Sequence, residues 1–129
     1  LLERIDLHVE VPRLPPSALR ADGPTGESSA AVRGRVLHAR AVQEARAGTP
    51  NARLDRAQTD AACRLSPRDT ALLERAVDSL QLSARSLHRI LRVARTIADL
   101  AGSANIETPH LTEAIGYRRL ERGRDRAAA

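Results

Sequence analysis

The sequence SARSLHRILRVARTIADLAG, residues 83–102, decides the fold predicted for this chain. Ser83 is a good N-cap residue because its hydroxyl can accept a hydrogen bond from a free N–H group of the first turn. Gly102 suits the position after a helix, since glycine adopts the left-handed conformation at little cost. The stretch therefore predicts an amphipathic helix. Its apolar residues recur at three- and four-residue spacing and share one face: Leu87, Ile90, Leu91, Ala94, Ile97, Ala98 and Ala101.

The arginines of this helix are expected to lie largely outside the apolar face: Arg85, Arg89, Arg92 and Arg95. An arginine-bearing face either is solvated and pairs with acids such as Glu74 or Asp99, or it meets an anion. Both interpretations stay open for the last three arginines. Their functional interpretation is contact with DNA phosphates or with a neighbouring subunit.

Composition also favours helices. The chain has 129 residues, of which 42% are hydrophobic but only 1% aromatic, with Tyr117 the single example. The core must then be built from Leu, Ile, Val and Ala, and small aliphatic side chains at helical spacing are typical of close-packed helices. We therefore predict a mainly α fold.

The formal net charge is +5 and the sequence pI is about 11.0. This fits a polyanionic partner such as DNA, but it fits a surface with dispersed arginines equally well. No apolar run is long enough to span a membrane and no signal peptide is visible, so we expect a soluble cytoplasmic protein. Cys63 has no CxxC partner and the histidines show no ligand spacing, so no metal site is predicted.

Two further helices complete a predicted three-helix unit, residues 66–122. One covers residues 66–80, with Ser66 as N-cap and Pro67 in the first position. The other begins at Thr108-Pro109 and is expected to run to about residue 121, with the stem of Arg118 facing inward. Residues 123–129 have no apolar face and are expected to fray.

The N-terminal part is less regular. Residues 5–11 alternate apolar and polar side chains, the period of a half-buried strand. A lone strand either pairs with strands outside this chain or is extended without a ladder, and we expect the chain to be cut from something longer. Residues 12–26 are proline-rich and predict a linker. Residues 27–47 predict a helix with a weak apolar face, and residues 51–65 a shorter one.

Several segments together resemble a known family. They are LLERIDLHVEVPRL, GESSAAVRGRV, NARL, Cys63, SARSLHRILRVARTIADLAG and IETPHLTEAIGYRRLER. In this combination the chain resembles the C-terminal part of bacterial magnesium-chelatase-like AAA+ ATPases, with the competence-associated ComM type the most similar. The resemblance covers nearly the whole chain.

This resemblance implies a ring-forming P-loop ATPase, expected to be a homohexamer, with ATP and Mg²⁺ bound in the full-length protein. Residues 1–26 would hold the last strand of the ATPase core and a linker, and residues 27–65 a connecting helix and loop. Residues 66–122 would be the C-terminal lid domain. For the competence-associated type it implies a helicase or branch-migration role on DNA.

The resemblance also assigns two residues. Arg4 matches the arginine finger that reaches the neighbouring subunit's ATP, although Glu3 and Ile5 depart from the usual S-R-F-D motif. Arg85 in Ser83-Ala84-Arg85 matches the sensor-2 arginine. The physics is compatible, because a first helical turn favours an anion and a guanidinium can hold a phosphate. The alternative for each is an exposed or ion-paired arginine.

No GxxxxGK[ST] loop is present in these 129 residues. We therefore expect the fragment alone to bind neither ATP nor Mg²⁺ and to show no ATPase turnover. Two alternatives remain: the ATPase motor of a magnesium chelatase, and a stand-alone basic helical module whose DNA binding falls steeply with salt. The unpartnered strand pattern argues against the second alternative.

Overall fold

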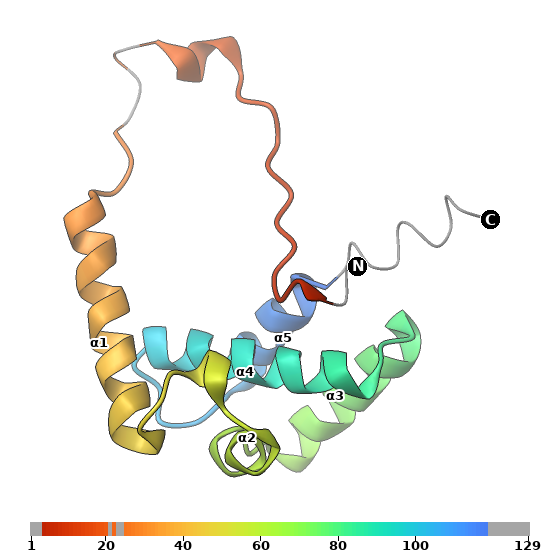
Figure 1. Ribbon diagram of the computed structural model, residues 1–129. Helices are drawn as coiled ribbons and strands as arrows, with labels where there is room; N and C mark the ends of the chain where they lie inside the picture. The colour runs from red at the N-terminus through yellow and green to blue at the C-terminus, as the bar shows by residue number, and fades with distance from the viewer. Residues whose placement is uncertain (1–3, 21, 23–24, 119–129) are drawn as a thin grey trace.

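The computed structural model describes residues 4–20, 22 and 25–118, and this part of the chain is mainly helical, as predicted (Figure 1). The elements, in chain order, are η2 (Pro16–Leu19), α1 (Ser29–Ala47), η3 (Asn51–Arg53), α2 (Arg56–Ala62), α3 (Pro67–Leu80), α4 (Ala84–Leu100) and α5 (Thr108–Gly116). The predictions for residues 119–129, including the frayed tail, lie outside the described residues.

Helix α4 begins and ends where the sequence predicts. The Ser83 hydroxyl accepts a hydrogen bond from the Ser86 N–H at 3.3 Å. After the helix, Gly102 has a φ of +70°, the Gly102 N–H donates to the Asp99 carbonyl, and the Ser103 N–H donates to the Ala98 carbonyl. This pair of bonds is a Schellman motif, which only a residue tolerant of positive φ can close at little cost.

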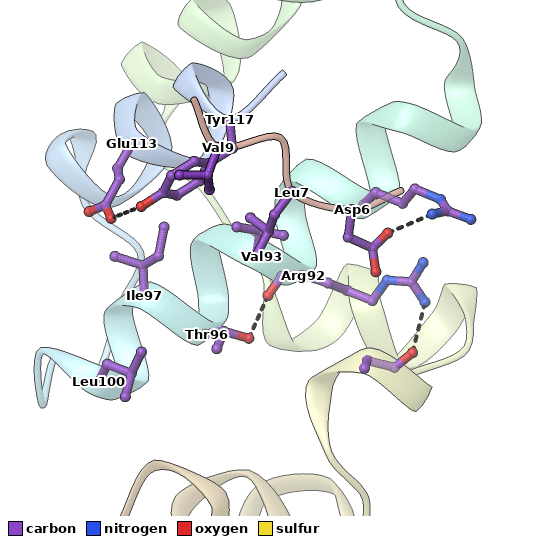
Figure 2. A pocket seen from close by; sticks show the side chains of 12 residues that line it. Asp6, Leu7, Val9, Arg92, Val93, Thr96, Ile97, Leu100, Glu113 and Tyr117 are labelled. Carbon is purple, nitrogen blue, oxygen red and sulfur yellow. Dashed lines mark hydrogen bonds and ion pairs between the residues drawn. The ribbon is translucent and has the colours of Figure 1, made fainter. Parts of the chain in front are cut away.

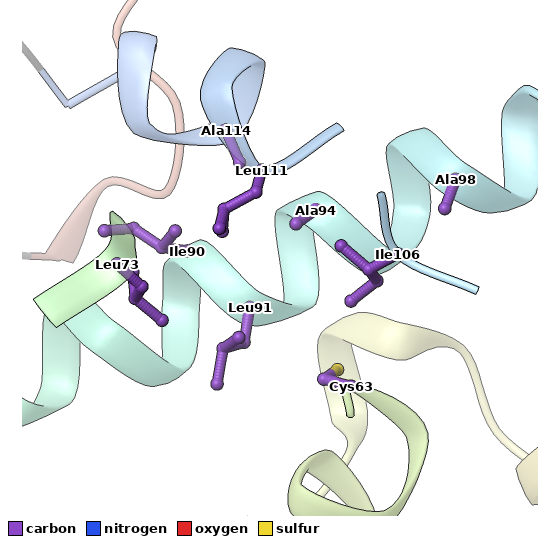
Figure 3. Packing of buried hydrophobic residues seen from close by; sticks show 9 residues of the cluster. All are labelled: Cys63, Leu73, Ile90, Leu91, Ala94, Ala98, Ile106, Leu111 and Ala114. Carbon is purple, nitrogen blue, oxygen red and sulfur yellow. The ribbon is translucent and has the colours of Figure 1, made fainter. Parts of the chain in front are cut away.

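The hydrophobic core surrounds α4 (Figure 3). Helices α1, α2 and α5 pack against α4, and α3 packs on α5. Its side chains come from α4, from α3 and α5, and from the connections that carry Cys63 and Ile106. Ala101, predicted to face inward, is exposed at the helix end. The buried cluster is Cys63, Leu73, Ile90, Leu91, Ala94, Ala98, Ile106, Leu111 and Ala114.

A carboxylate bridge joins α3 to α5. Ser66 caps α3 as predicted, by accepting from the Asp69 N–H at 3.1 Å. The predicted cap of α5 is wrong by one residue: Glu107 is the N-cap, and its N–H donates to His110 Nδ1 at 3.0 Å. Thr108 instead donates its hydroxyl to Asp69 Oδ1 at 2.6 Å. The helix start is therefore shaped by this tertiary contact.

Helix α1 lies beside one end of α4 (Figure 1). Ser28 caps it and Gly48, at a φ of +67°, ends it. Only Ala39 and Gln43 of this helix are buried, whereas Val32, Val36 and Val42 are exposed, in line with the weak apolar face that was predicted. The region 51–65 contains η3 and α2 rather than one helix.

The strand predicted for residues 5–11 is not formed, since no strand occurs anywhere in the described ranges. These residues form no ladder, because no second strand pairs with them in the part of the chain that the structure describes. We call residues 4–15 the N-terminal arm. Its beginning is held at the end of α5: the His8 N–H donates to the Tyr117 carbonyl at 3.0 Å, and Arg118 donates to the Ile5 carbonyl at 2.6 Å. Arg118 is 1% exposed, which confirms the inward direction predicted for its stem.

A buried polar junction fixes α1 on α4. The Asp99 side chain has 0% exposure and accepts hydrogen bonds from Arg46 at the end of α1, from Arg95 Nε at 3.1 Å and from Asn51 Nδ2 at 2.9 Å. The Asn51 N–H in turn donates to Gln43 Oε1 at 3.0 Å. We call these five residues the Asp99 junction.

No helix in the described part of the chain has the combined length and apolar character that crossing a bilayer requires.

Replacing Asp99 with alanine should lower the free energy of unfolding by about 3–5 kcal/mol, because Arg95 is then left as a buried charge without its carboxylate. Urea unfolding followed by far-ultraviolet circular dichroism would measure this, since the chain has no tryptophan. Asp78→Ala, on the exposed face of α3, is the matched control and should change little. A loss in Asp99→Ala no larger than the control's would contradict this account.

The Asp69 bridge predicts a pH dependence. Hydrogen bonds from the Thr108 hydroxyl and then from Ser66 lower the pKa of Asp69 below its ordinary 3.8. A lowered folded-state pKa stabilises the fold above about pH 4, and this contribution is lost as the pH falls through the folded pKa.

The stability difference between the native chain and Asp69→Asn should therefore shrink as the pH is lowered below 4. Thermal unfolding at a series of pH values would measure it. A difference that stays constant across that range would show that the bridge does not favour the charged carboxylate.

Candidate functional site

Arg85 lies in the first turn of α4 and is exposed. Among the residues that the structure describes, none accepts a hydrogen bond from its guanidinium or forms an ion pair with it. It lines a cleft of about 350 Å³ between the start of α2 and the N-terminal half of α4. We call this the α2–α4 cleft. Its lining residues are Leu54, Asp55, Arg56, Thr59, Ala84, Arg85, His88 and Arg92.

The charges of the α2–α4 cleft favour an anion. Arg56, Arg85 and Arg92 line it together with a single acid, Asp55. That carboxylate is already engaged, because Asp55 Oδ1 accepts the Gln58 N–H at 2.8 Å in the capping box of α2. The first turn of α4 adds its partial positive charge to the same cleft. The cleft therefore fits the oxygens of a phosphate group.

The cleft does not fit a metal ion equally well. Within the described ranges, no group of three or more His, Cys, Asp or Glu side chains could hold a metal. Magnesium prefers carboxylates together with phosphate oxygens and water. If a nucleotide and Mg²⁺ reach this cleft, its residues would bind the phosphate, and ligands for the ion would come from elsewhere.

Arg92 forms one wall of the cleft. Its guanidinium donates to the Leu54 carbonyl at 3.2 Å, at the turn that leads into α2. This contact holds the start of α2 at its distance from α4. The predicted alternatives for Arg92 were a solvated position or contact with an anion; the structure adds an internal role that supports the cleft.

Arg89 lies one turn after Arg85 but faces the N-terminal arm, where its Nη1 donates to Asp6 Oδ1 at 2.6 Å. Beside this ion pair is an apolar groove of about 360 Å³ between the arm, α4 and α5 (Figure 2). Leu7 of the arm lies beside Val93 of α4 there, and Val9 and Ile97 line the same groove. The arm thus packs on α4 through both charge and apolar surface.

The structure corrects the position that was expected for Arg95. It was expected outside the buried face, yet it is 2% exposed and belongs to the Asp99 junction. Its guanidinium also donates to the carbonyls of Ser103 at 2.7 Å and Ala104 at 3.0 Å. Arg95 lies four residues after Leu91 and three before Ala98, so it shares the buried face. Its pairing with Asp99 is one of the two alternatives that the sequence left open.

Arg4 is exposed at the start of the arm and does not line the α2–α4 cleft. The structure therefore does not bring Arg4 and Arg85 to one site within this chain. A residue that acts on a neighbouring subunit would have to lie away from the α2–α4 cleft of its own chain.

Sequence reasoning missed the residues that act through tertiary contacts. Arg56 joins Arg85 in the cleft, Asp6 pairs with Arg89, and Arg46 and Asn51 reach Asp99. The partners are separated by between 29 and 83 residues along the chain. No local pattern marks such pairs.

Comparison with known proteins places the chain in context. Residues 26–118 match the family described as "Magnesium chelatase, subunit ChlI C-terminal". Over 121 residues the chain is 49% identical to "Competence protein ComM" of Haemophilus influenzae and 43% identical to "Uncharacterized protein YifB" of Escherichia coli. It is 34% identical over 122 residues to "Uncharacterized protein Rv2897c" of Mycobacterium tuberculosis. These alignments cover 92–94% of the chain but 24% of each relative, so the chain spans about a quarter of their length.

Cys63 is buried in the core, and burial raises the pKa of its thiol from 9.0 to about 11. We predict that a thiol reagent at pH 8 modifies the native chain at least roughly a hundredfold more slowly than the urea-unfolded chain, because two pKa units remove that much thiolate. The release of coloured thiolate from an aromatic disulfide would measure both rates. Equal rates would contradict the burial of Cys63.

Proposed function

The chain belongs to the family of the magnesium chelatase subunit ChlI C-terminal domain, and from this premise we propose that it is the C-terminal lid of a ring-forming AAA+ ATPase of the ComM type. That ATPase would couple ATP hydrolysis to the remodelling of DNA, such as branch migration in natural transformation. The chain is 49% identical to a competence protein over 94% of its length, and this supports the ComM type. ATP, Mg²⁺, a hexameric ring of identical subunits, and DNA are its proposed cofactors and partners.

One observation carries the proposal: Arg85 faces the α2–α4 cleft from the first turn of α4 without an internal acidic partner in the described structure. Other arginines on α4 are engaged, Arg89 with Asp6 and Arg95 with Asp99. A guanidinium that the fold leaves unpaired beside a helix N-terminus is suited to a terminal phosphate. We assign Arg85 the sensor-2 role, which is to stabilise charge that develops during phosphoryl transfer.

Arg4 is the proposed arginine finger. Its exposure at the start of the arm leaves it able to reach a neighbouring subunit. The internal contacts of Arg89, Arg92 and Arg95 favour structural roles for these three residues over contact with DNA.

A second candidate is the ATPase motor that drives Mg²⁺ insertion into a tetrapyrrole. The description of the matching family, which names a magnesium chelatase subunit, favours it. The lid chemistry of Arg85 would be the same in both cases, but the partners differ. Stimulation of turnover by DNA supports the first candidate, whereas binding to the porphyrin-carrying chelatase subunit supports the second.

The test is Arg85→Ala in the longer protein that contains this chain. Its DNA-stimulated ATPase turnover should fall at least about tenfold, because removing one donor to the transition-state charge typically costs more than that. Arg75→Ala, on the exposed side of α3, is the matched control and should keep full turnover. Unchanged turnover in Arg85→Ala would remove this residue from the mechanism.

A further inference from the structure

The N-terminal arm follows a fixed path over four residues. Arg118 donates to the Ile5 carbonyl at 2.6 Å, Arg89 donates to the Asp6 carboxylate at 2.6 Å, and the His8 N–H donates to the Tyr117 carbonyl at 3.0 Å. These contacts alternate between α4 and the end of α5. Val9 still lines the groove beside α4, and beyond it the arm leaves the helices (Figure 1).

Each member of the ion pair is close in sequence to one of the two arginines to which the proposed function assigns chemistry. Arg4 is two residues before Asp6, and Arg85 is one helical turn before Arg89. Helix α4 is capped at both ends and buried along one face, so one turn of it is a rigid connection. Among the contacts of residues 5–8, the partly exposed Asp6–Arg89 pair is the one that joins the arm to α4.

We propose that Asp6 and Arg89 are a positioning pair, which fixes the arm segment that carries Arg4 to the helix that carries Arg85. This inference rests on the proposed function, since it concerns the roles that are assigned there to Arg4 and Arg85. A shift of α4 when Arg85 meets a phosphate would then move Arg4 toward or away from the neighbouring subunit. The pair does not touch the reacting atoms itself.

The exposure of the pair suits this role. The Asp6 side chain is 55% exposed and the Arg89 side chain 19% exposed. A partly solvated ion pair contributes little to global stability, in contrast to a buried one. Removing it should therefore loosen the arm relative to α4 and leave the helices folded, while the backbone contacts of Ile5 and His8 with the end of α5 remain. This separates positioning from structural support.

The direct test uses this chain, with spin labels on Arg4→Cys and on the exposed Ala84→Cys at the start of α4. Cys63 is buried and stays unlabelled. Double electron–electron resonance then gives the distribution of distances between arm and helix. We expect one narrow distribution in the labelled parent and a broader one in Asp6→Ala and in Arg89→Gln.

Two control variants test whether the change depends on this ion pair. Arg89→Lys keeps one charged donor for the single contact to Asp6 and should keep the narrow distribution. Arg75→Gln removes an exposed arginine on α3 and should keep it too. A distribution that stays narrow in Asp6→Ala or in Arg89→Gln, or that broadens equally in Arg75→Gln, overturns the positioning pair.

In the longer protein, Asp6→Ala and Arg89→Gln should lower ATPase kcat by about tenfold with KM for ATP unchanged, because a misplaced group costs rate rather than ground-state binding. The two proposals fail separately. Unchanged turnover in Arg85→Ala defeats the proposed function even where the spin-label distances behave as expected. Unchanged distances defeat the positioning pair even where Arg85→Ala abolishes turnover.

Discussion

A single buried carboxylate organises this chain. Asp99 lies near the end of α4 with a fully covered side chain, and it receives donors from α1, from η3 and from its own helix. Burying an ionised carboxylate costs free energy unless all its oxygens are hydrogen-bonded. The positions of Arg46, Asn51 and Arg95 are therefore set together. Arg95 also holds the turn after α4 in place, because its guanidinium donates to the carbonyls of Ser103 and Ala104.

The elements that could be predicted from sequence are those whose signals are local. Ser83 with Gly102, and Ser66 with Pro67, bound their helices because capping depends on neighbours within a few residues. The start of α5 was misplaced because Thr108 gives its hydroxyl to Asp69, 39 residues away. The arm was predicted as a strand because its alternation is correct for one, but a ladder requires a second strand.

Of the candidate site, only the position of Arg85 could be predicted. The family resemblance named this residue, and its place in the first helical turn after a serine cap is visible in sequence. Arg56 and the α2–α4 cleft were not predicted, since they depend on how α2 docks on α4. Arg95 was expected outside the apolar face, although its register with Leu91 and its spacing from Asp99 both indicated burial. For a charged residue, its register on the helix and an oppositely charged residue four positions away predict burial better than the residue type does.

The long route of the arm also has a kinetic consequence. Helices α3, α4 and α5 follow one another along the chain, so their contacts close short loops, whereas the arm meets α4 and α5 across 83 and 113 residues. Closing a longer loop costs more chain entropy. The contacts that offset this cost can form only after α4 and α5 have folded and present the surfaces to which the arm binds. The arm is therefore the last segment to dock during folding and the first to detach in a local opening. On the native protein its amide protons, from Asp6 to His8, would exchange with solvent ahead of those in α4.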